Sequence, residues 1–299
     1  MPNDPEILRK TLLAYVEALR RTGRRSLHLS PGWRQALRRV SLAPPEAGSN
    51  PLLPDPQAPP LPATKNPDGE RASTAPSVPP SGPVQSADHE ERVRRLEALR
   101  HSIVGCRRCT HLAAFRSQTV FGVGNPHARL FFAGEAPGAE EDRQGEPFVG
   151  PAGKLLTRMI QAMGLQREDV YIANILKCRP DLPRGTPGNR KPTPEEMQTC
   201  LPYLREQIRI IQPEVIVALG LTALEGLTGL AKGMSSLRGT FLDFQGIPLL
   251  PTFHPSYLLY RPDLRLKRQV WEDLLLVMER LKLPISERQR SFFLTKSQP

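Results

Sequence analysis

Long apolar runs, cysteines and aromatic residues are all scarce in this chain of 299 residues. No apolar run reaches the roughly 18–20 residues that a membrane-spanning helix needs, so we expect no such helix. The first residues, MPNDPEILRK, lack the basic start, apolar stretch and small-residue cleavage site of a secretory signal. We therefore expect a cytoplasmic protein. Because a reducing cytosol disfavours disulfides, the four cysteines indicate metal binding, catalysis or plain burial.

Positive charge, by contrast, is abundant. The formal net charge is +11 and the isoelectric point is near 9.9. An excess of Lys and Arg is typical of proteins that bind polyanions such as nucleic acid. A merely solvated basic surface has the same composition, so charge alone leaves both interpretations open.

Proline marks the organisation of the chain. Residues 43–87 carry many prolines, little apolar content and no aromatic residue, so they cannot bury enough surface to offset the entropy of ordering. Before them, residues 5–22 have the apolar spacing of an amphipathic helix and end in a basic run. The sequence therefore predicts a basic helical extension at 1–42, a disordered Pro-rich linker at 43–87, a globular domain at 88–282 and a flexible tail at 283–299.

The globular part alternates short apolar runs with helical patterns. This alternation predicts an α/β/α sandwich of three layers around a parallel sheet, because uninterrupted apolar strands are typical of sheets covered on both faces. The predicted strands are 129–133, 170–174, 214–219 and 247–252, and the predicted helices are 151–163, 194–211, 221–227 and 264–282.

Chemically useful residues follow three of these predicted strands: Glu135, Asn174 and His254. Ligands of such sheets bind outside the carboxyl ends of the strands. We therefore expect the three side chains to gather along one edge, although they are far apart in the sequence.

The cysteines allow four interpretations. Cys106 and Cys109 form a CxxC pair, whereas 21 residues separate Cys178 from Cys200. A thioredoxin-like redox pair is disfavoured because a charged helix, not a strand, precedes the CxxC. A zinc site usually has two tight pairs, whereas an iron–sulfur cluster needs four thiolates and is less strict about spacing. Ordinary buried thiols remain the alternative to a shared site.

Several motifs occur in a fixed order across residues 95–282: GEAPG followed by EED, then GEPFVGPAGKLL, VYIANILKCRP, NRKPTPEE and TFHPSYLL. This set resembles the iron–sulfur, family 4 type of uracil-DNA glycosylases. The resemblance implies a four-stranded parallel sheet between helices and a [4Fe-4S] cluster held by Cys106, Cys109, Cys178 and Cys200. It also implies a monomeric DNA-repair enzyme that hydrolyses the N-glycosidic bond of deoxyuridine in single- and double-stranded DNA, releasing uracil and leaving an abasic site.

Two departures from the family pattern stand out. Residues 181–188 lengthen the segment between Cys178 and Cys200. In a related subgroup, a histidine on a basic loop with a KRIH-like motif attacks the sugar. The corresponding stretch here, AKGMSSLRGTF, contains no histidine, so we expect no covalent adduct with DNA.

The loop from residue 134 to 150, GEAPGAEEDRQGEPFVG, is far longer than the usual strand-to-helix loop of about 2–6 residues. An enzyme that acts on a base swings it out of the stack into a closed pocket. In that interpretation Gly134 and Gly138 let the backbone approach the base, and backbone N–H groups around Ala136 bind a uracil carbonyl. Phe148 offers a stacking face, with a purely structural core position as the alternative.

Three side chains are the candidates for recognition and catalysis. The Asn174 amide presents one donor and one acceptor, which matches the edge of uracil and mismatches cytosine. Glu135 would position water and stabilise positive charge on the sugar, and His254 would donate to the developing charge on uracil O2. The structural alternatives are an Asn bonded to its own loop, a Glu paired with Arg143, and a satisfied histidine.

The HPSYLL segment and the basic run after it are the predicted DNA surface, with Leu258 or Leu259 as a wedge in the gap left by the flipped base. The DNA-contacting candidates are Arg261, Arg265, Lys267 and Arg268. The competing hypothesis is a non-catalytic iron–sulfur module that binds DNA or senses redox state. The N-terminal helix is a candidate docking element for another repair or replication protein.

Overall fold

The computed structural model describes residues 83–180, 188–230, 233–261 and 263–294. The predicted N-terminal helix, most of the predicted linker and the inserted residues 181–187 lie outside this range, so the expectations about them stay predictions. In the described part, no helix is both long and apolar enough to cross a membrane.

Six strands form one sheet in the order β1-β3-β2-β4-β6-β5. The four inner strands are parallel, and the two edge strands run antiparallel to their neighbours. The strand bounds are β1 Val123–Gly124, β2 Leu130–Gly134, β3 Tyr171–Asn174, β4 Val215–Leu219, β5 Leu242–Phe244 and β6 Ile247–Thr252.

The four predicted strands are confirmed, each starting within one residue of its predicted position. The expectation of a purely parallel, four-stranded sheet is corrected, since β1 and β5 add a short antiparallel edge on each side. These two strands have only two and three residues. They are too short to show an alternation of apolar and polar residues in the sequence. They form by pairing with the backbone of a longer neighbouring strand.

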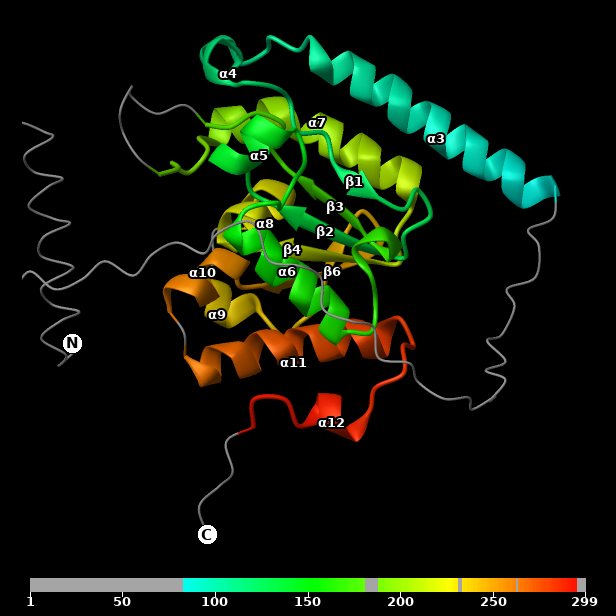
Figure 1. The fold of residues 1–299 in the computed structure, drawn as a ribbon, viewed down its shortest axis with the longest axis vertical. Coiled ribbons are helices and arrows are strands. Elements are labelled where there is room, and N and C mark those ends of the chain that lie inside the picture. Colours follow the sequence, from blue (N-terminus) through cyan, green and yellow to red (C-terminus); the bar gives the residue numbers. More distant parts are fainter. Residues whose placement is uncertain (1–82, 181–187, 231–232, 262, 295–299) are drawn as a thin grey trace, which may run out of the picture. The chain divides into compact units, whose positions relative to one another are not determined.

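Helices cover both faces of the sheet, as Figure 1 shows. α7 and α8 pack on one face and α6 and α11 on the other, which confirms the three-layer sandwich. The helices are α3 Pro83–Val104, α4 Thr110–Phe115, α5 Ala139–Gln144, α6 Pro151–Ala162, α7 Pro194–Ile211, α8 Leu221–Thr228, α9 Met234–Leu237, α10 Pro255–Tyr260, α11 Leu264–Arg280 and α12 Glu287–Arg290, with a 3-10 turn at Arg167–Asp169.

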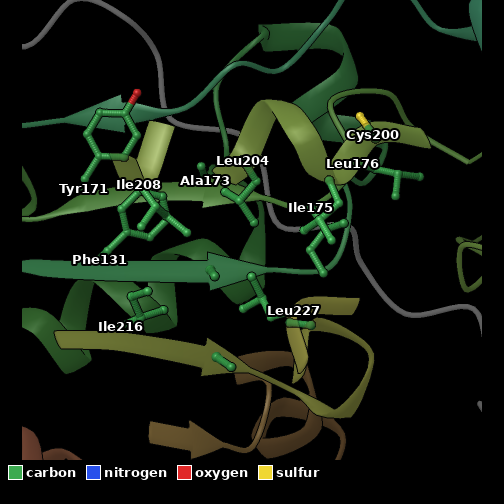
Figure 2. Packing of buried hydrophobic residues seen from close by; sticks show 14 of the residues in the cluster. Phe131, Tyr171, Ala173, Ile175, Leu176, Cys200, Leu204, Ile208, Ile216 and Leu227 are labelled. Carbon is green, nitrogen blue, oxygen red and sulfur yellow. The ribbon is translucent and has the colours of Figure 1, made fainter. Parts of the chain in front are cut away.

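Successive side chains of β2 point to opposite faces of the sheet and belong to two separate hydrophobic clusters. Phe131 and Ala133 face the layer of α7 and α8, where Figure 2 shows Phe131 beside Ile208 and Tyr171. Leu130 and Phe132 face α6 and α11. All five residues of β2 are buried, which is why the strand reads as a continuous apolar run in the sequence.

Local signals set the helix starts that position the site. α6 begins with Pro151 in its first turn, where a missing N–H costs nothing. α7 begins with a capping box in which Thr193 and Glu196 satisfy each other's backbone N–H groups. α10 begins directly after His254, which is its N-cap residue.

Candidate active site

The parallel register brings the carboxyl ends of the inner strands to one edge of the sheet. Gly134 at the end of β2 is paired with Asn174 at the end of β3, and Leu219 of β4 is paired with Thr252 of β6. Glu135, Asn174 and His254 therefore leave neighbouring strands at the same edge, as the sequence predicts. The side chain of Phe148, from the long loop, lies near Asn174 and His254.

Gly134 lies so close to Asn174 and Phe148 that it leaves no room for a side chain of its own. A Cβ atom placed on Gly134 would lie 2.2 Å from Asn174 Oδ1 and 2.6 Å from Cζ of Phe148. Real Cβ atoms do not come that close, so any other residue would displace the amide or the ring. The Phe148 ring in turn lies 5.6 Å, centroid to centroid, from the ring of His254. The Phe148 ring thus lies near both the Asn174 amide and the His254 imidazole.

The Asn174 side chain is buried, with 3% of its surface exposed. Among the described residues, its Oδ1 atom has no hydrogen-bond partner. A buried amide oxygen left without a donor costs free energy. The arrangement is therefore suited to a ligand that brings an N–H donor to this edge of the sheet.

Phe148 is held in an unusual backbone conformation. Its φ angle is +55°, a left-handed value that costs a residue with a Cβ atom about 1–2 kcal/mol. The first turn of α6 presses against it, since a Cβ on Gly153 would lie 1.8 Å from the Phe148 carbonyl oxygen. The Arg167 guanidinium also donates to the carbonyl of Pro147, just before Phe148. The surrounding structure therefore holds the Phe148 backbone in this conformation, which sets the direction of its ring.

Glu141 orders the long loop. Its carboxylate accepts hydrogen bonds from the backbone N–H groups of Gly138 (3.1 Å), Val149 (3.1 Å) and Gly150 (3.0 Å). Asp142 accepts from the backbone N–H of Ser117 and joins the loop to another segment. Glu141 and Asp142 thus have an internal role in holding the loop.

Gly138 differs from the expectation that it contacts the base. Its N–H is used by Glu141, and a Cβ on it would lie 2.8 Å from the Glu141 carboxylate and 3.2 Å from the Asn189 amide. Loop packing therefore explains this glycine. Ala136 remains the candidate for backbone contact with a substrate carbonyl.

The Glu135 carboxyl is half-buried. Burial raises its pKa above the usual glutamate value, while a hydrogen bond from the Thr222 side chain and the charge of Lys191 lower it. Its neighbours are thus Thr222, Lys191 and Glu225 rather than the predicted alternative, Arg143. Thr222 and Lys191 were not among the residues predicted from the sequence. Thr222 lies in α8, outside the motifs, and Lys191 lies in the motif NRKPTPEE but carried no predicted role.

His254 is neutral at pH 7. Burial lowers its pKa to about 4, and the charge of Glu141 opposes that shift. The Nδ1 atom accepts the backbone N–H of Ser256 at 3.2 Å. In a neutral imidazole, one nitrogen accepts and the other carries the proton, so Nε2–H is the available donor.

The basic run after α10 divides into two kinds of residue. The Arg261 guanidinium lies over the Tyr257 ring and donates to its hydroxyl at 3.0 Å, and Arg265 and Lys267 lie in the first turn of α11. Arg268 instead donates to Glu272 and to the backbone carbonyls of Arg290 and Phe292. Arg268 thereby joins α11 to the segment that follows α12.

The two candidate wedge residues also differ. Leu258 is buried in the core beside α11. Leu259 is exposed, and Tyr260 next to it is 85% exposed. Only Leu259 therefore has the exposure that a wedge needs.

The four cysteines line one cavity together with Arg116 and Tyr203. Three donors point at their sulfur atoms: Arg116 Nη1 at 3.0 Å from Cys178, the Tyr203 hydroxyl at 3.3 Å from Cys106, and the backbone N–H of Lys177 at 3.3 Å from Cys200. Burial raises the pKa of the Cys200 thiol to about 11 and shifts those of Cys109 and Cys178 in the same direction. Thiolates at this site therefore need a compensating positive group.

The four cysteines are the candidate ligand set for a metal site, because they share one cavity. Within the described ranges, no three His, Cys, Asp or Glu side chains are grouped to hold a metal ion. A zinc ion requires its ligands within about 2.3 Å of one centre, whereas each thiolate of an iron–sulfur cluster binds a different iron. The structure brings the four cysteines to one cavity, although 21 residues separate Cys178 from Cys200 in the sequence.

Comparisons with known proteins identify the family of the chain. Residues 121–275 match the family described as "Uracil DNA glycosylase superfamily". The "Type-4 uracil-DNA glycosylase" of Thermotoga maritima is 45% identical over 185 residues, which cover 61% of this chain and 93% of that protein. The protein of the same name from Archaeoglobus fulgidus is 44% identical over 57% of this chain and 86% of its own.

A "Type-5 uracil-DNA glycosylase" of Thermus thermophilus is more distant, at 32% identity over 62% of this chain and 91% of that protein. The family match spans β2, β3, β4, β6 and the loops that carry the candidate site. The chain therefore belongs to the uracil DNA glycosylase superfamily.

Proposed function

We propose that this chain is a DNA-repair glycosylase that hydrolyses the N-glycosidic bond of deoxyuridine in DNA, releasing uracil and leaving an abasic site. The type-4 relatives and the superfamily match support the reaction. The observation that carries the assignment to a site is the group formed by Gly134, Asn174 and Phe148 at the ends of β2 and β3.

We assign a flat pyrimidine to this group and call the position beside Phe148 and Asn174 the base slot. The Phe148 ring supplies a stacking face, and the Asn174 amide reads the edge of the base. Uracil offers an N3–H donor to Oδ1 and an O4 acceptor to the amide nitrogen, whereas cytosine presents the inverted pattern. A site that pairs a specific polar edge discriminates by factors on the order of 10⁴–10⁵.

Bond cleavage then follows from the charges of the site. When the bond between the sugar C1′ and uracil N1 breaks, the electron pair goes to uracil and positive charge develops on the sugar. The Nε2–H group of His254 donates to O2 of the departing uracil, and the ionised Glu135 carboxylate stabilises the sugar cation. Water adds to C1′ and gives up a proton to Glu135 or to solvent.

The four cysteines would hold a [4Fe-4S] cluster in the cavity that they share. Bound there, the cluster would cross-link the segment before α4, the end of β3 and α7. The Arg116 guanidinium would offset negative charge on Cys178, and the Tyr203 hydroxyl would donate a hydrogen bond to Cys106. The reaction proposed above needs no electron transfer, so the role of this site is structural.

DNA would lie along α10 and the start of α11, with Arg261, Arg265 and Lys267 near phosphates and Leu259 at the gap in the stack. Arg268 is left out because its guanidinium is bonded within the protein. The monomeric state, the cytoplasmic location, action on both single- and double-stranded DNA, and a partner for the N-terminal helix stay predictions. A non-catalytic DNA-binding or sensor module would not need Glu135, Asn174 and His254 together.

The test is single-turnover excision on an oligonucleotide with one uracil, followed by heating in alkali to cut abasic sites. We expect cleavage at uracil and none with thymine or cytosine in its place. Gly134→Ala should lower the rate on the order of 10²-fold, because the new Cβ displaces Asn174 or Phe148.

Gly233→Ala is the matched control, since a Cβ there meets nothing within 4 Å and the φ angle is −62°. No cleavage by wild-type protein would contradict the proposed function. An active wild type whose Gly134→Ala variant keeps full activity would instead contradict the location of the base slot.

A further inference from the structure

Lys177 is a buried, titratable side chain that the proposed reaction does not use. It follows β3 in the segment NILKCRP and has 1% of its surface exposed. A buried ammonium is costly unless it is fully hydrogen-bonded. The hydrogen bonds that the Lys177 side chain makes should therefore explain why it is buried in the core.

The Lys177 ammonium has three acceptors for its three N–H donors. Nζ lies 2.8 Å from the carbonyl oxygen of Asn174, 3.0 Å from that of Phe121 and 2.6 Å from Oε1 of Gln207. These three acceptors match the three N–H groups that the protonated side chain carries. One residue thus joins the end of β3 to the segment before β1 and to α7.

The Gln207 side chain completes this buried network. Its Nε2 atom donates to the carbonyl of Phe121 at 3.0 Å and to the Tyr171 hydroxyl at 3.3 Å. Both Lys177 and Gln207 therefore hold the Phe121 carbonyl, while Lys177 alone reaches the peptide group of Asn174. The network fixes the backbone from which the Asn174 amide projects.

The backbone of Lys177 also contacts the four-cysteine site. Its N–H donates to Cys200 Sγ at 3.3 Å, and Cys178 is the next residue in the chain. The Lys177 main chain therefore donates a hydrogen bond to Cys200, and its side chain donates one to the backbone carbonyl of Asn174.

We propose that Lys177 is a positioning residue for uracil recognition, which acts through the Asn174 peptide group and ties the base slot to the four-cysteine site. This inference rests on the proposed function. It assigns to Lys177 neither contact with the substrate nor a proton transfer.

A double-mutant cycle tests the inference. Lys177→Met, Asn174→Ala and the double variant would be compared in single-turnover excision and in inhibition of excision by free uracil. We expect Lys177→Met to lower the rate on the order of 10–100-fold, as displacement of a recognition group by about 1 Å does, and to weaken inhibition by uracil.

The decisive comparison is in the Asn174→Ala background. There Lys177→Met should change the rate by no more than about twofold, the usual error of additivity, because the group through which it acts is gone. Equal losses in both backgrounds would overturn the inference. Lys282→Met, at an exposed position beyond α11, is the matched control and should leave the rate unchanged.

Iron content and melting temperature, measured for every variant, separate positioning from loss of the fold. If Lys177→Met does not fold, Gln207→Met decides the question, since it removes one acceptor of Nζ and touches no cysteine. A smaller loss that disappears in the Asn174→Ala background supports the inference, and no loss or an additive loss overturns it. A wild-type protein that excises no uracil would overturn the proposed function itself, which is a different outcome.

Discussion

At the residue scale, burial shifts the two candidate catalytic groups in opposite directions. The pKa of the Glu135 carboxyl is raised, and that of His254 is lowered to about 4. Burial disfavours the charged form of each group. Near neutral pH this leaves His254 as a neutral donor, whereas Glu135 becomes protonated at a higher pH than an ordinary glutamate.

The acid limb of the excision rate should therefore belong to Glu135. As the pH falls, the rate should drop at a pH above the usual glutamate value of about 4.3, because the protonated acid no longer stabilises the sugar cation. His254 stays neutral until about pH 4 and contributes nothing to this limb. Glu135→Gln should lower the rate on the order of 10²-fold and abolish the limb.

Single-turnover rates between about pH 5 and pH 8 check this prediction. Glu140→Gln, at an exposed position in the same loop, is the control and should keep the wild-type profile. An unchanged acid limb in Glu135→Gln would assign the titration to another group.

At the element scale, the start of α7 depends on one buried carboxylate. Glu196 accepts from the backbone N–H of Thr193 at 2.8 Å, from Arg190 at 2.6 and 2.9 Å, and has His111 Nε2 at 2.7 Å. Burial alone would raise its pKa, but these hydrogen bonds outweigh burial and lower the pKa to about 2. Glu196 thereby joins α7 to α4, the two helices that flank the four-cysteine site.

Glu196→Ala should lower the free energy of unfolding by about 2–3 kcal/mol. This loss is at or below the range for breaking a fully buried ion pair, because Arg190 is partly exposed. The folded-state pKa is depressed, so this contribution is present above the usual glutamate value and is lost as the pH falls toward 2. The difference in unfolding free energy between wild type and variant should therefore be constant from pH 7 to about pH 5 and shrink below it.

Urea unfolding at several pH values measures this difference. Glu195→Ala, one residue earlier and exposed, should change the unfolding free energy by less than about 0.5 kcal/mol. A difference between wild type and Glu196→Ala that does not depend on pH would show that Glu196 acts through packing rather than charge.

At the scale of the whole molecule, every proposed site residue lies in the part of the chain that begins with α3. The helix starts at Pro83, inside the predicted linker. The Thermotoga maritima relative matches this chain over 185 residues, along 93% of its own length.

Deletion of residues 1–82 should therefore leave the single-turnover excision rate unchanged when enzyme is in excess. The reason is that the slot, the strand ends and the four cysteines are all retained. A large loss of rate at saturating enzyme would instead give the extension a part in the active site. If deletion changed only the enzyme concentration needed to reach the full rate, the extension would have a role in DNA binding. Its basic residues would then contact phosphates.

The sequence by itself determined the inner strands, the long helices and the order of the strand-end residues, because burial periodicity and helix-start signals are local. Only the tertiary structure decided which distant groups meet. It added the short edge strands, gave Gly138 and Arg268 internal partners, separated buried Leu258 from exposed Leu259, and placed Lys177 between Asn174 and Cys200. A hydrogen bond across tens of residues leaves no periodic mark in the sequence, since its geometry exists only once the layers have packed.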